Sequence, residues 1–338
     1  MSKPTGAAWR NWKKARGRQR KAAGLVATPD SWDNDWKACQ LGDGFTDPVE
    51  RPPLPSPELT AEEIIEYRMR KFERKRSYEV ARQLINVDVP ITGPYGILHF
   101  GDPHVDDDGT DLRKLKHDIK IVKDTPGLFA ANIGDTRNNW VGRLARLYGE
   151  QGVSAKEALI LADWFLRELK GKWIYLIGGN HDAWSGADDP LDWISSQINA
   201  LYEPSEARLN LISPSGASTT INARHDFKGS SQWNVAHPVM KASMLGIRDD
   251  VFICGHKHTC GYGVVKSPDD GRISHCLQIG SYKIYDRFAR DKGFRDQHIS
   301  PCVVTVIDPG ADLINRIQVF WDAEAGAEYL TFLRSRKR

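Results

Sequence analysis

The chain has 338 residues, of which 40% are hydrophobic and 27% are charged, as is ordinary for a globular protein. No run approaches the ~18 apolar residues that a membrane helix requires, and the first residues lack the apolar core of a signal peptide. The five cysteines are odd in number and form no CxxC pair, which disfavours a disulfide framework and a zinc ribbon. We therefore expect a cytoplasmic protein with no membrane partner.

The net charge of +3 is distributed unevenly along the chain. Residues 1–28 contain eight basic side chains and no acidic one, and the last five residues add four more basic side chains. The remaining 35 basic and 44 acidic side chains give the body of the chain a net charge of −9. Such a body is unusual for a protein that grips long nucleic acid in a basic groove, but it suits one that holds cations.

The first 58 residues predict an arm and a linker. Residues 1–28 lack hydrophobic periodicity and indicate a disordered basic arm that includes Trp9 and Trp12. Trp32 and Trp36 would lie on one side of a short helix if one forms, and would dock the arm onto the body or anchor a partner. Five prolines between residues 42 and 58 predict an extended, semi-rigid connector.

A helical extension is expected over residues 59–90. Thr60 and Glu63 have the spacing of a capping box, which predicts a helix from there to about Leu84. Its middle, from Arg68 to Arg76, is rich in arginine and lysine. We interpret this run as a solvated face, with a phosphate-contacting face as the alternative.

From Tyr95 onward, strands and helices alternate. Apolar runs predict strands at 95–100, 128–133 and 173–177, and helical periodicity predicts helices at 112–122, after Ser154, and at 191–201. The second half is rich in predicted strands, at 209–212, 219–224, 251–254, 273–279, 302–307 and 314–321. This pattern predicts an α/β domain at 91–325, with two sheets packed face to face and helices outside, followed by a basic tail at 326–338.

One stretch combines a buried strand with a polar turn. Gly178 and Gly179 follow the strand at 173–177 and permit a sharp turn and a close approach. Asn180, His181 and Asp182 come next, at the strand end where open α/β sheets bind their ligands. Three polar side chains after a glycine turn indicate a site.

Four more predicted strands end in residues that commonly bind metals. Residues i and i+2 of an extended segment point the same way, so two such pairs can each direct two ligands into one cleft. A single histidine pair would be explained equally well by an ordinary buried histidine. Five such segments in chain order are not explained in that way. The residues are Asp102 and His104, Asp135, Asn180 and His181, His225, and His256 and His258.

Carboxylate, imidazole and amide oxygen ligands without a thiolate suit divalent ions such as Mn²⁺, Fe²⁺ or Zn²⁺. Seven ligands exceed the need of one tetrahedral site, so two ions that share a carboxylate fit better. We expect Mn²⁺, with Fe²⁺ or Zn²⁺ as the alternatives.

The ordered set Asp102-x-His104, Gly134-Asp135, Gly179-Asn180-His181-Asp182, His225 and Gly255-His256-x-His258 resembles the calcineurin-like metallophosphoesterase superfamily. The resemblance covers residues 95–321 and implies a four-layer α/β/β/α sandwich around a two-metal centre. It implies that Asp102, His104 and His258 hold one ion, that Asn180, His225 and His256 hold the other, and that Asp135 bridges them. It also implies that a metal-bridging hydroxide attacks phosphorus while His181 contacts the phosphate and assists the leaving oxygen.

Two positions depart from the superfamily's better-known branches. Phosphoprotein phosphatases have an aspartate and then an arginine where this chain has Asn138 and Asn139, and double-strand-break repair nucleases usually have a histidine at the first position. Asn138 can hydrogen-bond His181, but it lacks the charge that would raise the pKa of that histidine. The basic arm, proline connector and basic tail resemble phosphoesterases of tailed bacteriophages, which would place the protein in a host cytoplasm.

The motifs leave the substrate open. The leading hypothesis is a phosphodiesterase or nuclease for nucleic acid or nucleotides, with the basic arm binding DNA or RNA. A small-nucleotide phosphatase or cyclic phosphodiesterase is the alternative enzyme, and a DNA- or partner-binding protein with a secondary metal site is the alternative of another class.

Arg137 and Lys257 are the nearest candidates for phosphate contact. Asp106–Asp108 form either a solvated turn or a phosphate-repelling one, and Tyr282 and Tyr285 either stack a base or pack in the protein. Oligomeric state is not encoded in these motifs.

Overall fold

The computed structural model describes residues 5–26, 28–40, 58–185, 189–291, 293, 295–296, 298 and 300–336. The chain divides into two compact units, Met1–Phe72 and Glu73–Arg338. The predicted proline connector and the last two residues lie outside the described residues. No helix in the described part of the chain is long and apolar enough to cross a membrane.

The described part of the first unit includes the helices α1 (Gly6–Ala22) and α2 (Pro29–Gln40). The prediction of disorder is therefore wrong over residues 6–22. This segment is a helix that lacks the apolar stripe by which helices are usually predicted. Trp9 and Trp12 of α1 contact Trp36 and Trp32 of α2 edge-on. Helix α3 (Ala61–Ala81) runs across the boundary between the units and begins at the predicted capping box, with Thr60 and Glu63 bonded reciprocally.

The second unit contains two six-stranded sheets. Sheet A has the order β1-β6-β7-β8-β10-β9 and sheet B the order β12-β11-β2-β3-β4-β5. Sheet A is formed by β1 (Ile85–Asp88), β6 (Glu206–Ile212), β7 (Ser218–Arg224), β8 (Val251–Cys254), β10 (Ile273–Gln278) and β9 (Gly261–Lys266). Sheet B is formed by β12 (Ile317–Phe320), β11 (Cys302–Ile307), β2 (Tyr95–Phe100), β3 (Leu128–Asn132), β4 (Trp173–Ile177) and β5 (Tyr202–Glu203).

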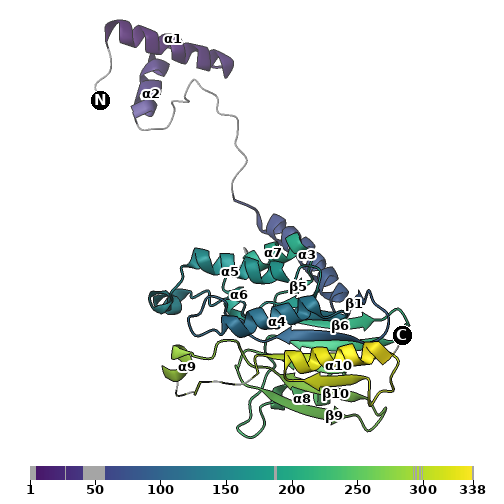
Figure 1. Ribbon diagram of the computed structural model, residues 1–338. Helices are drawn as coiled ribbons and strands as arrows, with labels where there is room; N and C mark the ends of the chain where they lie inside the picture. The colour runs from purple at the N-terminus through teal and green to yellow at the C-terminus, as the bar shows by residue number, and fades with distance from the viewer. Residues whose placement is uncertain are drawn as a thin grey trace. The chain divides into compact units, whose positions relative to one another are not determined.

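The two sheets face each other across one apolar core, and helices cover their outer faces (Figure 1). Neighbouring residues of β2 point to different cores: Ile97 packs between the sheets, and Leu98 packs against the helices. This explains why the strand is a continuous apolar run without alternation. The covering helices are α4 (Leu112–Asp124), α5 (Ala155–Glu168), α7 (Pro190–Ile198) and α10 (Ala323–Arg336) on sheet B, and α8 (His237–Leu245) on sheet A. The predicted four-layer α/β/β/α sandwich is confirmed.

Several boundaries differ from the expected ones. Residues 85–88, expected in the helical extension, form β1 and pair in parallel with β6. Residues 326–336, expected as a tail, continue α10, in which Ala327 and Leu330 are buried. Periodicity also did not predict α8, whose second residue is a proline, or β9, which contains two glycines. The remaining short helices are η1 (Gly142–Glu150), α6 (Asn180–Ala183) and α9 (Arg287–Asp291).

A buried histidine between the sheets makes stability depend on pH. His99 of β2 is fully buried and bonded to the Tyr175 hydroxyl at 2.8 Å and the Thr305 hydroxyl at 2.9 Å. Burial lowers the pKa of His99 to about 3. Below the ordinary pKa of histidine the unfolded chain takes up a proton that the folded chain does not, so acid lowers the free energy of unfolding.

We expect His99→Gln to remove part of this acid sensitivity. The advantage of the parent chain over the variant should shrink by up to about 1.4 kcal/mol for each pH unit between about 6.5 and about 3. Urea unfolding at several pH values, in a chelator, measures this difference. His117→Gln, at a histidine whose side chain is 49% exposed, is the control. Parallel curves for the parent and His99→Gln would contradict the expectation.

Candidate metal centre

The predicted site residues lie at the carboxyl ends of strands from both sheets. In sheet B, the neighbouring parallel strands β2, β3 and β4 lead to Asp102 and His104, to Asp135, and to Asn180. In sheet A, the neighbouring parallel strands β7 and β8 lead to His225 and to His256 and His258. Parallel strands end at a common edge, so residues distant in sequence meet in one place.

One group consists of Asp102, His104 and His258. The Nε2 atom of His258 lies 3.2 Å from Asp102 Oδ2 and 3.3 Å from His104 Nε2. Asp102 and His104 are buried, and one potential ligand atom of each residue lies within 4.8 Å of the others. This is the set that the resemblance assigns to the first ion.

The second group is built around His225. Its Nε2 atom lies 3.2 Å from Asp135 Oδ2, 3.0 Å from Asn180 Oδ1 and 3.2 Å from His256 Nδ1. Asp135 also forms a group with His104 and His181 in which ligand atoms lie within 4.8 Å of one another. The carboxylate of Asp135 thus lies between the two sets of imidazoles, the position that a bridging ligand requires.

The donor set fits divalent cations. Asp102 Oδ1 and His104 Nδ1 are buried and have no hydrogen-bond partner among the described residues. The Nε2 atoms of His104 and His258 lie 3.3 Å apart, beside the Asp102 carboxylate. Together these groups have more lone pairs than protons that could bridge them. A cation satisfies such a cluster, and oxygen and nitrogen ligands without sulfur suit the ions named above.

The backbone is strained at the same place. Six non-glycine residues in the described part of the chain have positive φ, and five of them belong to the site's loops: His104, Asp135, Asn139, His256 and His258. Such conformations cost about 1–3 kcal/mol each and persist where surrounding structure enforces them. Gly179 and Gly255 permit this packing, because a Cβ atom there would lie 2.0 Å from Asp135 Oδ1 or 2.4 Å from Asp102 Oδ1.

The ionisable groups of the centre shift one another's pKa. Burial lowers the pKa of His104, and the cation of Lys283 lowers it further, so the ring is neutral and able to act as a ligand. Burial also opposes the charge of His225, but the Asp135 carboxylate raises the pKa of His225 to about 10. Conversely, burial raises the pKa of Asp135, and His225 lowers it more, to below its usual range. Asp135 and His225 therefore form a buried ion pair, and a cation must displace the proton of His225.

His181 is held at the rim of this centre. Its backbone amide donates to Asp135 Oδ1 at 2.9 Å, and its Nε2 lies 3.8 Å from Asp135 Oδ2. Its Nδ1 donates to the backbone carbonyl of Asn138, which directs Nε2 toward the centre. The predicted hydrogen bond between Asn138 and His181 is thus present, but its acceptor is the backbone carbonyl of Asn138. The Asn138 side chain instead bonds Asp107 Oδ2 at 2.8 Å and Gln151 at 3.1 Å, so its predicted contribution to catalysis stays a prediction.

The two predicted phosphate contacts have different outcomes. Arg137 is only 5% exposed, bonds the Asn139 side chain at 3.2 Å and the Ser185 hydroxyl at 2.8 Å, and does not line the cavity over the centre. Lys257 lines that cavity, and its ammonium group contacts the Gly229 carbonyl at 2.9 Å and Asp226 at 3.1 Å. Lys257 is therefore placed where it can contact a substrate, and the predicted phosphate contact of Arg137 has no support from its position.

The cavity over the centre has a volume of about 720 Å³ and includes side chains that no sequence motif indicated. Trp140 and Trp184 flank His181, with ring centroids 5.1 and 4.3 Å from the imidazole. Lys283 also lines the cavity, although it is 4% exposed and paired with Asp107 at 2.9 Å and Asp286 at 3.3 Å. These residues come from loops without a recognisable pattern, so only the fold could reveal them.

The acidic loop and the two tyrosines also have definite positions. Asp106 accepts from the Asn138 amide and Asp107 from the Asn138 side chain, so this loop supports the segment that orients His181. It is not a free solvated turn. Tyr282 is fully buried and bonds Asp118 at 2.8 Å, which excludes base stacking, whereas Tyr285 is 54% exposed.

Asp182 joins the loops that contain Asp135 and Asn180. Its Oδ2 accepts from the Gly179 amide at 2.9 Å and from the Thr136 amide at 3.3 Å, and the residue is fully buried. Asp182→Ala leaves both amides without their acceptor, so we expect the free energy of unfolding to fall by about 2–5 kcal/mol. Urea unfolding measures the change. Asp163→Ala, which removes an exposed pair with Arg167, should cost less than about 1 kcal/mol. Equal effects would contradict the role of Asp182.

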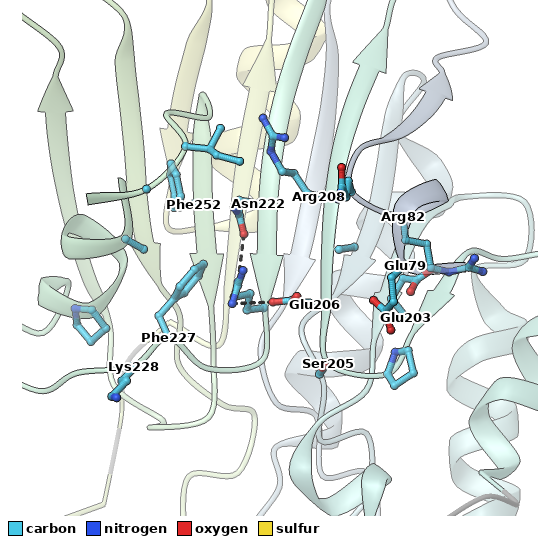
Figure 2. Close-up of a pocket in the computed structure, with 18 of the residues that line it drawn as sticks. Glu79, Arg82, Glu203, Ser205, Glu206, Arg208, Asn222, Phe227, Lys228 and Phe252 are labelled. Carbon is cyan, nitrogen blue, oxygen red and sulfur yellow. Dashed lines mark hydrogen bonds and ion pairs between the residues drawn. The ribbon is translucent and has the colours of Figure 1, made fainter. Parts of the chain in front are cut away.

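A second, larger groove of about 880 Å³ lies on the outer face of sheet A (Figure 2). Its arginines are paired with acids: Arg82 with Glu203 at 2.8 Å, Arg224 with Glu206 at 2.6 Å, and Arg208 with Asp249 at 2.9 Å. None of the metal-binding groups lines it. The chemistry indicated by the sequence therefore lies in the smaller cavity.

No protein-family model and no curated protein sequence matches the chain. Solved structures that resemble it include nuclease MPE from Pseudomonas putida, with 13% identity, a TM-score of 0.33, and coverage of 66% of this chain and 87% of that one. The calcineurin-like phosphoesterase YfkN from Bacillus subtilis has 14% identity, a TM-score of 0.35, and coverage of 72% and 96%. Vacuolar protein sorting 29 from Cryptosporidium parvum has 12% identity, a TM-score of 0.36, and coverage of 64% and 87%. Similarity at this level carries no conclusion about activity, which has to be argued from the site itself.

Proposed function

We propose that the protein is a metal-dependent phosphoesterase of the calcineurin-like type that hydrolyses phosphodiester bonds in nucleic acid or nucleotides. The observation that carries the proposal is the convergence of seven carboxylate, imidazole and amide ligands from five loops, with Asp135 shared between the groups. Two divalent ions bound there, Mn²⁺ by preference, would activate a water molecule and neutralise the charge on the phosphoryl oxygens.

The protein's own residues complete the reaction. His181 donates its Nδ1 proton to the Asn138 carbonyl, so the imidazolium form, which also has a proton on Nε2, would pass that second proton to the leaving oxygen. Trp140 and Trp184 pack around the imidazole and limit its motion, and the side chain of His181 remains 14% exposed. Lys257 and Lys283 also line the cavity, where each ammonium group is paired with a carboxylate and could contact a bound anion.

Nucleic acid or a nucleotide is favoured as the substrate because the cavity combines cations with aromatic walls. Its volume of about 720 Å³ lies within the range of small-molecule sites. That size also supports the second candidate, hydrolysis of a small nucleotide by a phosphatase or cyclic phosphodiesterase.

An activity panel tests the proposal. Metal-stripped protein supplemented with Mn²⁺ is assayed on bis-p-nitrophenyl phosphate, p-nitrophenyl phosphate, single- and double-stranded DNA, and cyclic nucleotides. We expect hydrolysis of the diester that is abolished by a chelator and restored by Mn²⁺. Faster hydrolysis of the monoester or cyclic nucleotides would favour the second candidate, and no metal-dependent hydrolysis of any substrate would contradict both.

A further inference from the structure

Helices α1 and α2 form a hairpin closed by four tryptophans. The rings of Trp9 and Trp12 stack with centroids 4.8 Å apart, and Trp36 meets them edge-on at 5.9 and 5.4 Å. Trp32 contacts Trp12 edge-on at 6.4 Å. Each aromatic contact of this kind contributes about 0.5–1.5 kcal/mol beyond area burial. The four tryptophans thus pack against one another inside the hairpin.

An ion-pair cluster fixes which side of α1 faces α2. Asp35 of α2 lies 3.1 Å from Arg16 and 2.9 Å from Arg20. These two arginines are partly buried and follow Trp9 and Trp12 along the same face of the helix. Of the other basic residues of α1, Lys13 lies over the Trp9 ring at 5.0 Å, and the remaining four are exposed.

Four of those residues form one stripe, defined here as the α1 stripe: Arg10, Lys14, Arg18 and Lys21. Their spacings of four, four and three residues place them on a single face, opposite the face that meets α2. All four are exposed, and residues 1–28 contain no acidic side chain. At 1.5 Å per residue the stripe is about 16 Å long.

We propose that the α1 stripe binds the phosphate backbone of duplex nucleic acid, which makes the hairpin a preformed docking module. A rigid row of cations on a helix suits a backbone or a major groove. Single-strand binding usually requires aromatic platforms, but here the tryptophans stack on one another. The stripe is flanked on α1 by Ala7, Asn11, Ala15 and Ala22, so it lacks the large apolar residues that insert into a membrane.

Binding can be measured without hydrolysis, so the result does not depend on the metal centre. The full chain in a chelator is titrated with a fluorescent duplex of about 20 base pairs at salt concentrations from about 50 to about 200 mM. Replacing all four stripe residues by glutamine should weaken binding about 100-fold at the lowest salt and flatten the salt dependence by about 3 units. The matched control replaces Arg68, Arg70, Arg74 and Lys75 on α3, which are also exposed, and should leave affinity and slope nearly unchanged.

Near-ultraviolet circular dichroism of the tryptophans reports whether the stripe variant retains its hairpin. Trp12→Ala, which removes three of the four ring contacts, gives the spectrum of an opened hairpin for comparison. Equal losses in the stripe and control variants, or no loss in a correctly folded stripe variant, would overturn the proposal. Tighter binding to a single strand of the same length, or to vesicles containing phosphatidylserine, would overturn it in favour of another partner.

Discussion

Asp135→Asn should abolish both metal retention and activity. The carboxylate lies between two sets of imidazoles, and an amide supplies only one weak oxygen ligand and no charge. We expect kcat/KM for bis-p-nitrophenyl phosphate to fall by more than about 100-fold, beyond the loss typical of groups that only orient ligands. The measurement is steady-state kinetics with saturating Mn²⁺.

The control for this variant is Asp163→Asn, which changes the same charge on the surface of α5. It should retain the parent's metal content and rate. Unchanged activity in Asp135→Asn would show that the carboxylate does not serve both ions.

His181→Ala should impair chemistry while leaving the metals bound. The imidazole lies at the rim, oriented by the Asn138 carbonyl, and is not needed to complete either proposed ligand set. Loss of a general acid lowers kcat by about 10²–10⁴-fold. The loss should be smaller for a good leaving group such as p-nitrophenolate, which needs less protonation.

Paired substrates with good and poor leaving groups measure this dependence, and elemental analysis checks the metals. His117→Ala, at an exposed histidine on α4, serves as the control. An equal loss for both leaving groups would exclude the acid role, and loss of metal would make His181 a ligand.

The central strands of the sheets could be predicted because they are buried on both faces. Stretches such as 173–177 and 302–307 are continuous apolar runs, and their observed bounds are the expected ones. The ligand set could be located because each residue lies within four residues of the end of a predicted strand. Once the strands are identified, parallel pairing brings their polar ends together without further information.

Other features depend on contacts that periodicity does not encode. Helix α1 has no conventional apolar stripe, and it packs through two tryptophans and two arginines that meet partners on α2. The Asn138 contact to His181 runs through a backbone carbonyl, which residue identity does not reveal. Lys283, Trp140 and Trp184 reach the cavity from loops whose paths are set by tertiary packing.

The most direct test of the two-metal proposal is anomalous diffraction from crystals grown with Mn²⁺. We expect two anomalous peaks, one beside Asp102, His104 and His258 and the other beside Asn180, His225 and His256, with Asp135 in contact with both. A single peak, or peaks away from Asp135, would contradict the account.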